Sequence, residues 1–182
     1  MIKVKKFGGT SVSDTTKILN IAKKCEKDYK EGHKIVVVLS AMGKYTDELI
    51  AISKEISGNV PKREMDMLLT CGEQISVSLM AMAFDKLGIP AVSLNAFQVK
   101  ILTNDTYGDA EIIKIETERI EKELAKNKIV IIAGFQGIDK ARKLYDPWKR
   151  RLRHNSSSLG CYSKSRHLRN LHRRRRRVHS RP

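Results

Sequence analysis

The sequence predicts an α/β protein in which a mainly parallel sheet lies between helices. Two apolar runs rich in β-branched residues, Lys34–Leu39 and 128–133, are typical of strands that are covered on both faces. Segments with helical spacing of apolar residues separate these runs, and this alternation of strand and helix favours parallel pairing. The chain has 182 residues, of which 41% are apolar, and this is enough for one substantial core.

The first 30 residues have the pattern of a strand, a glycine turn and a helix. Apolar residues alternate with lysines up to Phe7, and Asp14 is one of several N-cap residues before a helix expected over Thr15–Lys30. Glycines without a Cβ let anionic oxygens approach backbone N–H groups, and Lys6 adds a positive charge. The string K-F-G-G-T-S-V from Lys6 is therefore a candidate phosphate-binding turn, although a tight turn beside an exposed lysine explains its Gly-Gly-Thr about equally well.

Two further helices are expected over 46–57 and 62–87. Helical spacing in the second predicts an apolar stripe made of Met65, Leu68, Leu69, Gly72, Ile75, Ser76, Leu79, Met80, Ala83, Phe84 and Leu87. Glu73 falls within the core-facing arc, where a carboxylate without a partner would be costly. The alternative is a glutamate at the edge of the stripe that reaches solvent or pairs with Lys62 or Arg63.

The remaining elements are shorter. Ala91–Leu94 is expected to be a buried strand and 101–110 a polar loop. Residues 111–126 fit a helix, although 110–115 could equally be a strand. The loop 134–137, Gly-Phe-Gln-Gly, follows the last clear strand and fits a binding loop or a plain turn equally well.

Charge is distributed unevenly along the chain. The formal net charge is +16, and residues 141–182 hold 15 of the 36 Lys and Arg residues but one of the 20 acidic residues. By itself such a tail could bind nucleic acid through counterion release. Three cysteines without a pairing or zinc pattern, no long apolar run and no leader pattern predict a cytoplasmic protein that does not enter a membrane.

Four motifs, taken in order, resemble those of the aspartate kinases of the amino-acid kinase family. They are K-F-G-G-T-S-V, S-A-M-G-K-x-T-D-E-L from Ser40, T-C-G-E-Q around Glu73, and V-I-I-A-G-F-Q-G ending at Gly137. The resemblance implies the three-layer amino-acid kinase fold and transfer of phosphate from ATP to L-aspartate, which gives 4-phospho-L-aspartate. This is the first step of the aspartate pathway to lysine, threonine and methionine.

The resemblance also implies roles for individual residues. ATP and Mg²⁺ are the implied cofactors, with Lys6 as the catalytic residue and a nucleotide-binding set made of Lys6, Phe7, Gly8, Gly9, Thr10, Ser11 and Ser40. The implied L-aspartate-binding residues are Thr46, Glu73, Phe135 and Gln136, with Glu73 holding the substrate ammonium. No residue is assigned as a metal ligand. Phe97 and Cys71 depart from the family pattern, which has a tryptophan and a small residue there.

The tail suggests a frameshift. With suitable codons, residues 146–154 and 166–181 read one base later give T-L-G-R-G-G-S-D and D-I-C-E-I-Y-T-D-V-D-G-V-Y-T-A-D, two further motifs of the family. We therefore predict a truncated N-terminal part of a kinase domain over 1–140 and a disordered, out-of-frame basic tail over 141–182. Such a chain is expected to be inactive or impaired, whereas an intact member would form homo- or hetero-oligomers.

Two other functions stay open. Another amino-acid kinase, acting on carbamate, glutamate or UMP, would share the glycine turn but should lack the motifs at Ser40 and Glu73. A non-enzymatic basic protein could bind nucleic acid through the tail. If the tail is out of frame, no evolved nucleic-acid partner is expected.

Overall fold

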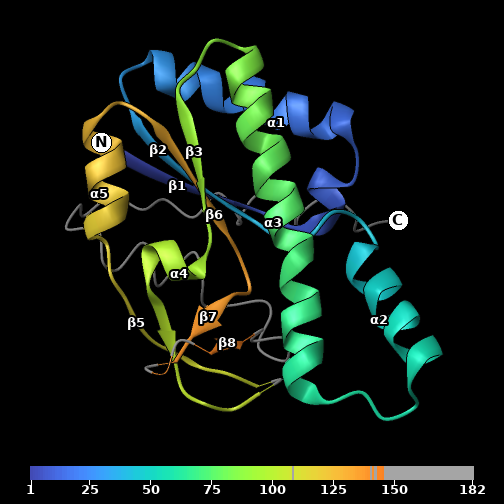
Figure 1. The fold of residues 1–182 in the computed structure, drawn as a ribbon. Helices are drawn as coiled ribbons and strands as arrows, with labels where there is room; N and C mark the ends of the chain where they lie inside the picture. Colours follow the sequence, from blue (N-terminus) through green and yellow to red (C-terminus); the bar gives the residue numbers. More distant parts are fainter. Residues whose placement is uncertain (108, 140, 142, 146–182) are drawn as a thin grey trace, which may run out of the picture.

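The computed structural model of the protein describes residues 1–107, 109–139, 141 and 143–145, and contains two sheets (Figure 1). Four parallel strands form the larger sheet in the order β1 (Ile2–Phe7), β2 (Lys34–Leu39), β6 (Ile129–Ala133) and β3 (Ala91–Leu94). The central strands β2 and β6 pair over Val36 to Leu39 and are buried almost throughout. The predicted parallel sheet is confirmed, and its buried middle corresponds to the two β-branched runs.

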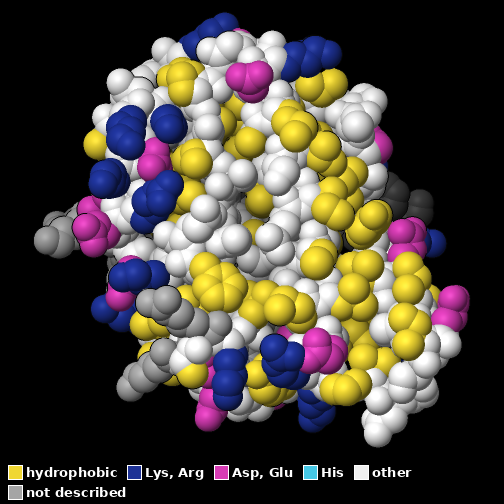
Figure 2. Space-filling view, viewed as in Figure 1, with side chains coloured by type: hydrophobic (Ala, Val, Ile, Leu, Met, Phe, Trp, Pro, Cys, Tyr) yellow, Lys and Arg dark blue, Asp and Glu magenta, His cyan; other side chains and the backbone are white. Residues whose placement is uncertain are grey.

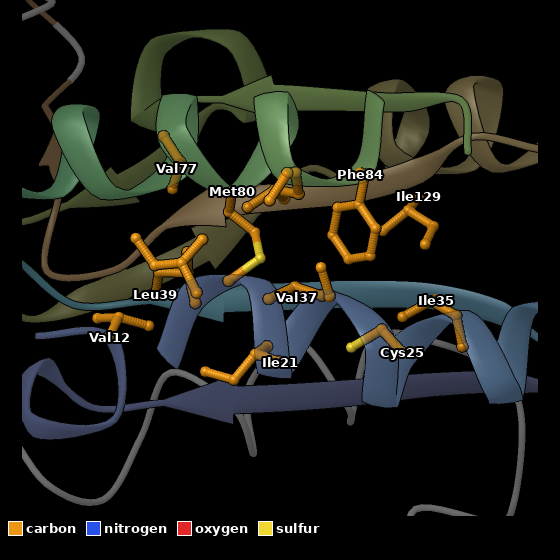
Figure 3. Packing of buried hydrophobic residues seen from close by; sticks show 14 of the residues in the cluster. Val12, Ile21, Cys25, Ile35, Val37, Leu39, Val77, Met80, Phe84 and Ile129 are labelled. Atoms are coloured by element: carbon orange, nitrogen blue, oxygen red, sulfur yellow. The ribbon is translucent and has the colours of Figure 1, made fainter. Parts of the chain in front are cut away.

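Helices cover both faces of this sheet. On one face lie α1 (Thr15–Lys30) and α3 (Lys62–Lys86), and α5 (Glu118–Ala125) lies on the other. The α1/α3 face has a tightly packed core, in which side chains of both helices meet alternate residues of β2 (Figure 3). Residues labelled there include Ile21, Cys25, Val37, Leu39, Val77, Met80 and Phe84. Alternation along the strands divides the apolar side chains between the two cores.

The ends of α1 follow the sequence prediction. The Asp14 side chain accepts a hydrogen bond from the Lys17 N–H at 2.8 Å and so caps the first turn. Gly32 follows the helix with φ +80°, a left-handed conformation that glycine adopts without strain. The next helix, α2 (Tyr45–Ile56), begins and ends one residue before the helix expected over 46–57 and packs beside α3.

By length and composition alone, α3 is apolar enough to cross a membrane, but half of its most apolar stretch is buried inside the protein. It packs on α1, α2 and the strands β3 and β6, which is the environment of a core helix. One predicted stripe residue is wrong, because Ile75 is 38% exposed. At about 100° per residue Ile75 lies roughly 200° from Glu73, and Asp66 and Val77 are buried on the inner face instead.

A smaller sheet has the order β5 (Ile112–Ile115), β4 (Ile101–Thr103), β7 (Gly137–Ile138) and β8 (Leu144–Tyr145). The prediction of a loop over 101–110 is therefore wrong for residues 101–103, which form β4. The strand alternative at 110–115 is confirmed, and helix follows only from Glu118. Such short strands depend on pairing between distant segments, here β4 with β7, so local spacing gives little sign of them.

Two short elements lie where the sequence predicted none. A short helix, α4 (Ala96–Val99), has a capping box between Asn95 and Gln98, which was not predicted. The strand β8 lies beyond residue 140, where the basic tail is expected to begin. Residues 146–182, which make up most of that expected tail, lie outside the described part of the chain.

Candidate active site

Three loops meet at the carboxyl edge of the parallel sheet. They follow β1, β2 and β6, and parallel pairing brings the ends of these strands to one edge. Backbone hydrogen bonds join the loops, since Ser40 N–H donates to Phe7 O at 3.2 Å and Gly134 N–H donates to Leu39 O at 2.8 Å. Three of the four sequence motifs are thereby brought together.

Close backbone packing around the β2 loop requires glycines. A Cβ on Gly9 would lie 2.6 Å from Ala41 O, and a Cβ on Gly134 would lie 2.8 Å from Leu39 O. Gly72 of α3 approaches from another side, where its Cβ would lie 2.8 Å from the Ala41 Cβ. Glycines of three segments thus hold this loop. The contacts of Gly72 and Gly134 were not foreseen, because they depend on residues far away in the sequence.

Gly8 differs from these glycines. A Cβ built on it meets no atom within 4 Å, and its φ of −81° suits any residue. Open space therefore lies beside the backbone at the start of the turn, and the short 3-10 helix Gly9–Val12 follows immediately. A residue without a Cβ leaves this space clear for a ligand to approach the backbone.

Glu73 is the fourth predicted contributor to this edge. Glu73 is 5% exposed, and its Oε1 accepts a hydrogen bond from the Ala41 N–H at 3.1 Å. The prediction that Glu73 faces the core and needs a partner is confirmed, and the alternative of a glutamate reaching solvent is wrong. A buried carboxylate is costly unless it is hydrogen-bonded, so the β2 loop and α3 fix each other here.

Lys6 is the second-to-last residue of β1, and its ammonium lies near the loop that follows β6. Its Nζ lies 5.2 Å from the centre of the Phe135 ring, a distance at which a cation is attracted to the face of an aromatic ring. Burial lowers the Lys6 pKa from its ordinary value, because desolvation disfavours the charged form. Phe135 has φ +51°, which is uncommon for a residue with a side chain.

The family follows from a sequence comparison. The profile of the amino acid kinase family matches residues 1–158, which is most of the chain. The chain belongs to the amino acid kinase family. It is 54% identical over 136 residues to an aspartokinase of Bacillus sp. strain MGA3, an alignment that covers 75% of this chain and 33% of that relative. The chain thus spans about a third of the length of the curated relatives it matches.

Solved structures agree with the family and the fold. The structure of aspartate kinase from Synechocystis is 40% identical, has a TM-score of 0.63, and is matched over 75% of this chain and 22% of that one. The structure of Escherichia coli aspartokinase III in complex with aspartate and ADP has a TM-score of 0.69 at 22% identity, covering 80% and 43% of the two chains. The second comparison supports the fold alone.

Gln136 braces the candidate site from within. It is 1% exposed, its Nε2 donates to Thr70 O at 2.8 Å, and its Oε1 accepts from Ala96 N–H at 3.3 Å. Its amide thus connects the β6 loop to α3 and to the start of α4. In this structure both ends of the amide are engaged within the protein, while its role toward a substrate stays a prediction.

The other predicted residues lie in the same loops. Phe7 ends β1 and is half-buried, whereas Thr10 and Ser11 are exposed on the 3-10 helix. Ser40 directly follows β2, and Thr46 lies in the first turn of α2; both are half-buried. All of these residues therefore lie at or just after the carboxyl ends of β1 and β2, and none of them is fully buried.

An apolar hollow lies elsewhere in the described part of the chain, between α5 and the amino-terminal half of β1. Its lining residues are Ile2, Val4, Val36, Thr117, Ile120, Glu121 and Leu124. Lysine and arginine are absent from this set, and its one charged residue is Glu121. A phosphorylated ligand therefore has no counter-charge in this hollow, and the chemistry favours the carboxyl edge of the sheet.

Proposed function

We propose that this chain carries the N-terminal part of an aspartate kinase catalytic domain, in which phosphate passes from ATP to the side-chain carboxylate of L-aspartate. The observation that carries the proposal is the meeting of the glycine turn with Lys6, the β2 loop and Glu73 at one sheet edge. The similarity to aspartokinases over 75% of the chain supports this choice of substrate within the family.

The glycine turn is assigned to the phosphates. Lys6 would donate to phosphate oxygens, together with backbone N–H groups of Gly8 and Gly9, and the open space beside Gly8 fits a bulky anion. Because Lys6 is half-buried, its attraction to a phosphate is screened less than that of an exposed lysine. Mg²⁺ bound with ATP would supply further neutralisation of phosphate charge, and we assign it no ligand from this chain.

The aspartate side is assigned to residues around the β2 and β6 loops. Glu73 would hold the substrate ammonium while its Oε1 stays bonded to the Ala41 N–H. Thr46 and the 134–137 loop, with Phe135 and Gln136, would contact the rest of the amino acid. Phosphoryl transfer requires the attacking carboxylate oxygen to lie in line with the leaving oxygen. The loops that follow β1 and β6, which flank Ser40, would set that alignment.

We further propose that the basic tail is an out-of-frame product and that this chain alone has little or no turnover. Alignments with the curated aspartokinases span 134 to 140 residues, close to the length that precedes the basic segment. The R-G-G-S-D motif, which the family uses for catalysis, is absent from the printed sequence, and residues 146–154 can give it only with suitable codons that are read one base later. A cytoplasmic enzyme and an oligomeric intact form belong to the same proposal.

The test compares two products of the gene in an assay that couples ADP formation to L-aspartate. The 182-residue chain should show little activity, whereas the product translated in the shifted frame beyond residue 140 should be active. Lys6→Ala in that longer product should abolish activity without changing its far-UV circular dichroism. Preference for glutamate, carbamate or UMP over L-aspartate would reject the substrate, and coding DNA whose codons exclude the shifted motifs would reject the frameshift.

A further inference from the structure

The side-chain amide of Gln136 is enclosed by the protein. Gln136 is 1% exposed, and Thr70 and Ala96, the two residues that its amide bonds, are buried as well. Figure 2 shows hydrophobic and other uncharged atoms over the region between α3 and α4. A ligand therefore cannot reach this amide unless the protein around it moves.

The bond to Ala96 completes the cap of α4. The first N–H groups of a helix have no acceptor within the helix itself. The capping box between Asn95 and Gln98 satisfies the N–H groups of those two residues, and the Ala96 N–H donates to Gln136 Oε1 at 3.3 Å. Ala96 is buried, so this donor depends on the amide oxygen. The oxygen of the Gln136 amide must therefore face α4, and its nitrogen must face α3.

One turn of α3 holds both loops that were assigned to L-aspartate. Thr70 O accepts from Gln136 Nε2, which belongs to the loop after β6, and Glu73 Oε1 accepts from the Ala41 N–H in the loop after β2. Residues three apart on a helix lie about 60° apart around its axis and so are neighbours on one face. The spacing between the two loops is therefore set by one helical turn and the length of one glutamine side chain.

Phe135 is held between two anchored neighbours. Its φ of +51° costs energy for a residue with a Cβ, and such a conformation persists when the surroundings enforce it. On one side Gly134 N–H donates to Leu39 O at 2.8 Å, and on the other side Gln136 is bonded to α3 and α4. The Phe135 ring in turn lies 5.2 Å from the Lys6 ammonium. Loss of the Gln136 bonds would remove one anchor and let the ring leave this position.

We propose that Gln136 is a positioning residue for the L-aspartate site, whose amide spaces the loop after β6 from α3 and thereby places Phe135. This inference rests on the proposed function and refines it, because the contact with the amino acid that was assigned to the 134–137 loop is made by Phe135. Both side-chain bonds of Gln136 go to α3 and α4 rather than to the glycine turn assigned to MgATP. The affinity for L-aspartate therefore depends on this amide, whereas the affinity for MgATP does not.

The experiment replaces the amide in the 182-residue chain. Gln136→Met keeps a side chain of similar length but makes neither hydrogen bond. In NMR titrations it should weaken L-aspartate binding about fivefold, the loss expected for one typical hydrogen bond. Because the glycine turn is a separate site, the MgATP affinity should change less than about twofold. Weakening of both ligands to the same extent would overturn the proposal.

Gln74→Met is the matched control. Gln74 Nε2 contacts the same acceptor, Thr70 O, at 3.4 Å, but from the exposed face of α3. This variant loses an amide at the same carbonyl and keeps the anchor of the loop after β6, so both affinities should stay unchanged. L-aspartate binding that is weakened equally in the two variants would overturn the proposal.

The side-chain N–H resonances of Gln136 distinguish positioning from direct contact. In the wild-type chain these protons should exchange slowly with water, because the amide is buried and bonded to Thr70 O. On addition of L-aspartate they should move less than the backbone amide of Phe135. Larger shifts at the Gln136 side chain would show that it touches the amino acid and would overturn the proposal, and this measurement needs no variant to fold.

A ligand-free measurement separates this proposal from the proposed function. The Phe135 ring should shift the Lys6 side-chain methylene resonances upfield, and Phe135→Leu identifies that effect. Gln136→Met should remove the shift, whereas Gln74→Met should retain it. If this pattern is found but the wild-type chain binds no L-aspartate, the substrate assignment fails and the placement of Phe135 by Gln136 stands. If the shift persists in Gln136→Met, the proposal fails whichever amino acid binds.

Discussion

Three lysines of β1 lie within four residues and have different environments. Lys3 and Lys5 point toward α1, where both ammonium groups pair with the Asp28 carboxylate. Lys6 points to the other side of the sheet, where its ammonium lies over the Phe135 ring. Alternation along a strand sends neighbouring residues to opposite faces, so one lysine reaches the loop edge and two secure a helix.

The pKa values show the same difference. Burial alone would raise the pKa of Asp28, but hydrogen bonds and charges from Lys3 and Lys5 outweigh it, so the pKa is lowered. For Lys6 burial dominates and lowers the lysine pKa. A charge that is half-buried beside an open glycine turn is suited to meeting an anion, whereas charges that neutralise each other are suited to stability.

The largest expected effect is on phosphate binding. Lys6→Ala should weaken binding of MgATP by about ten- to a hundredfold, since a hydrogen bond to a charged group contributes about 1.5–3 kcal/mol. Lys5→Ala should leave that affinity unchanged while lowering stability. Ligand-observed NMR measures both affinities in the millimolar range, and equal losses in the two variants would remove the distinction between the lysines.

Packing of the β2 loop gives the next effect. Gly72→Ala should lower the free energy of unfolding by about 1–3 kcal/mol, because the new Cβ would meet the Ala41 Cβ at 2.8 Å. Gly58→Ala is the matched control, because its Cβ would meet no atom within 4 Å. Urea denaturation measures the free energy of unfolding of both variants. An unchanged value for Gly72→Ala would show that this loop is free to shift.

Gly8→Ala separates stability from binding. Its Cβ enters open space, so the free energy of unfolding should change by less than about 0.5 kcal/mol. The same methyl group would occupy the space assigned to a phosphate, so MgATP affinity should fall several-fold. Unchanged affinity, measured in the same NMR titration, would place the phosphates elsewhere.

The parallel sheet and its helices were predictable because each leaves a long local signal. Lys34–Leu39 and the run that ends at Ala133 are continuous β-branched segments, and Asp14 marks the start of α1. The smaller sheet left no such signal, since β7 and β8 have two residues each and exist only through pairing. Ile75 was misplaced by an angular error, although the local sequence contained the information.

The candidate site was predictable in its members but not in its contacts. The need for a partner at Glu73 follows from its position on a helix, whereas the identity of that partner, the Ala41 N–H, follows only from the fold. Similarly, a Gly-Phe-Gln-Gly loop indicates a turn or a binding loop, but no local rule gives the contacts of Gln136 with α3 and α4.

The smallest effect concerns the paired lysines. Asp28→Asn should cost about 1 kcal/mol at neutral pH, because the carboxylate is partly exposed and its ion pairs are partly screened. Since the folded-state pKa of Asp28 is lowered, its stabilisation is present above the unfolded-state pKa and is lost as pH falls through the folded-state pKa. The difference between wild type and variant, measured by urea denaturation, should therefore vanish in acid; a difference that persists there would exclude the charge as its cause.

The most direct test of the proposed site is an NMR titration of the isotopically labelled chain with L-aspartate. We expect weak, saturable shifts at the amides of residues 40–46, 73 and 134–136, with little change at Asp28. Glu73→Gln keeps an acceptor for the Ala41 N–H but loses the charge. It should weaken the L-aspartate binding that these shifts report by about tenfold. Shifts that map elsewhere, or that are equal in the variant, would contradict the placement of L-aspartate at Glu73 and the β2 and β6 loops.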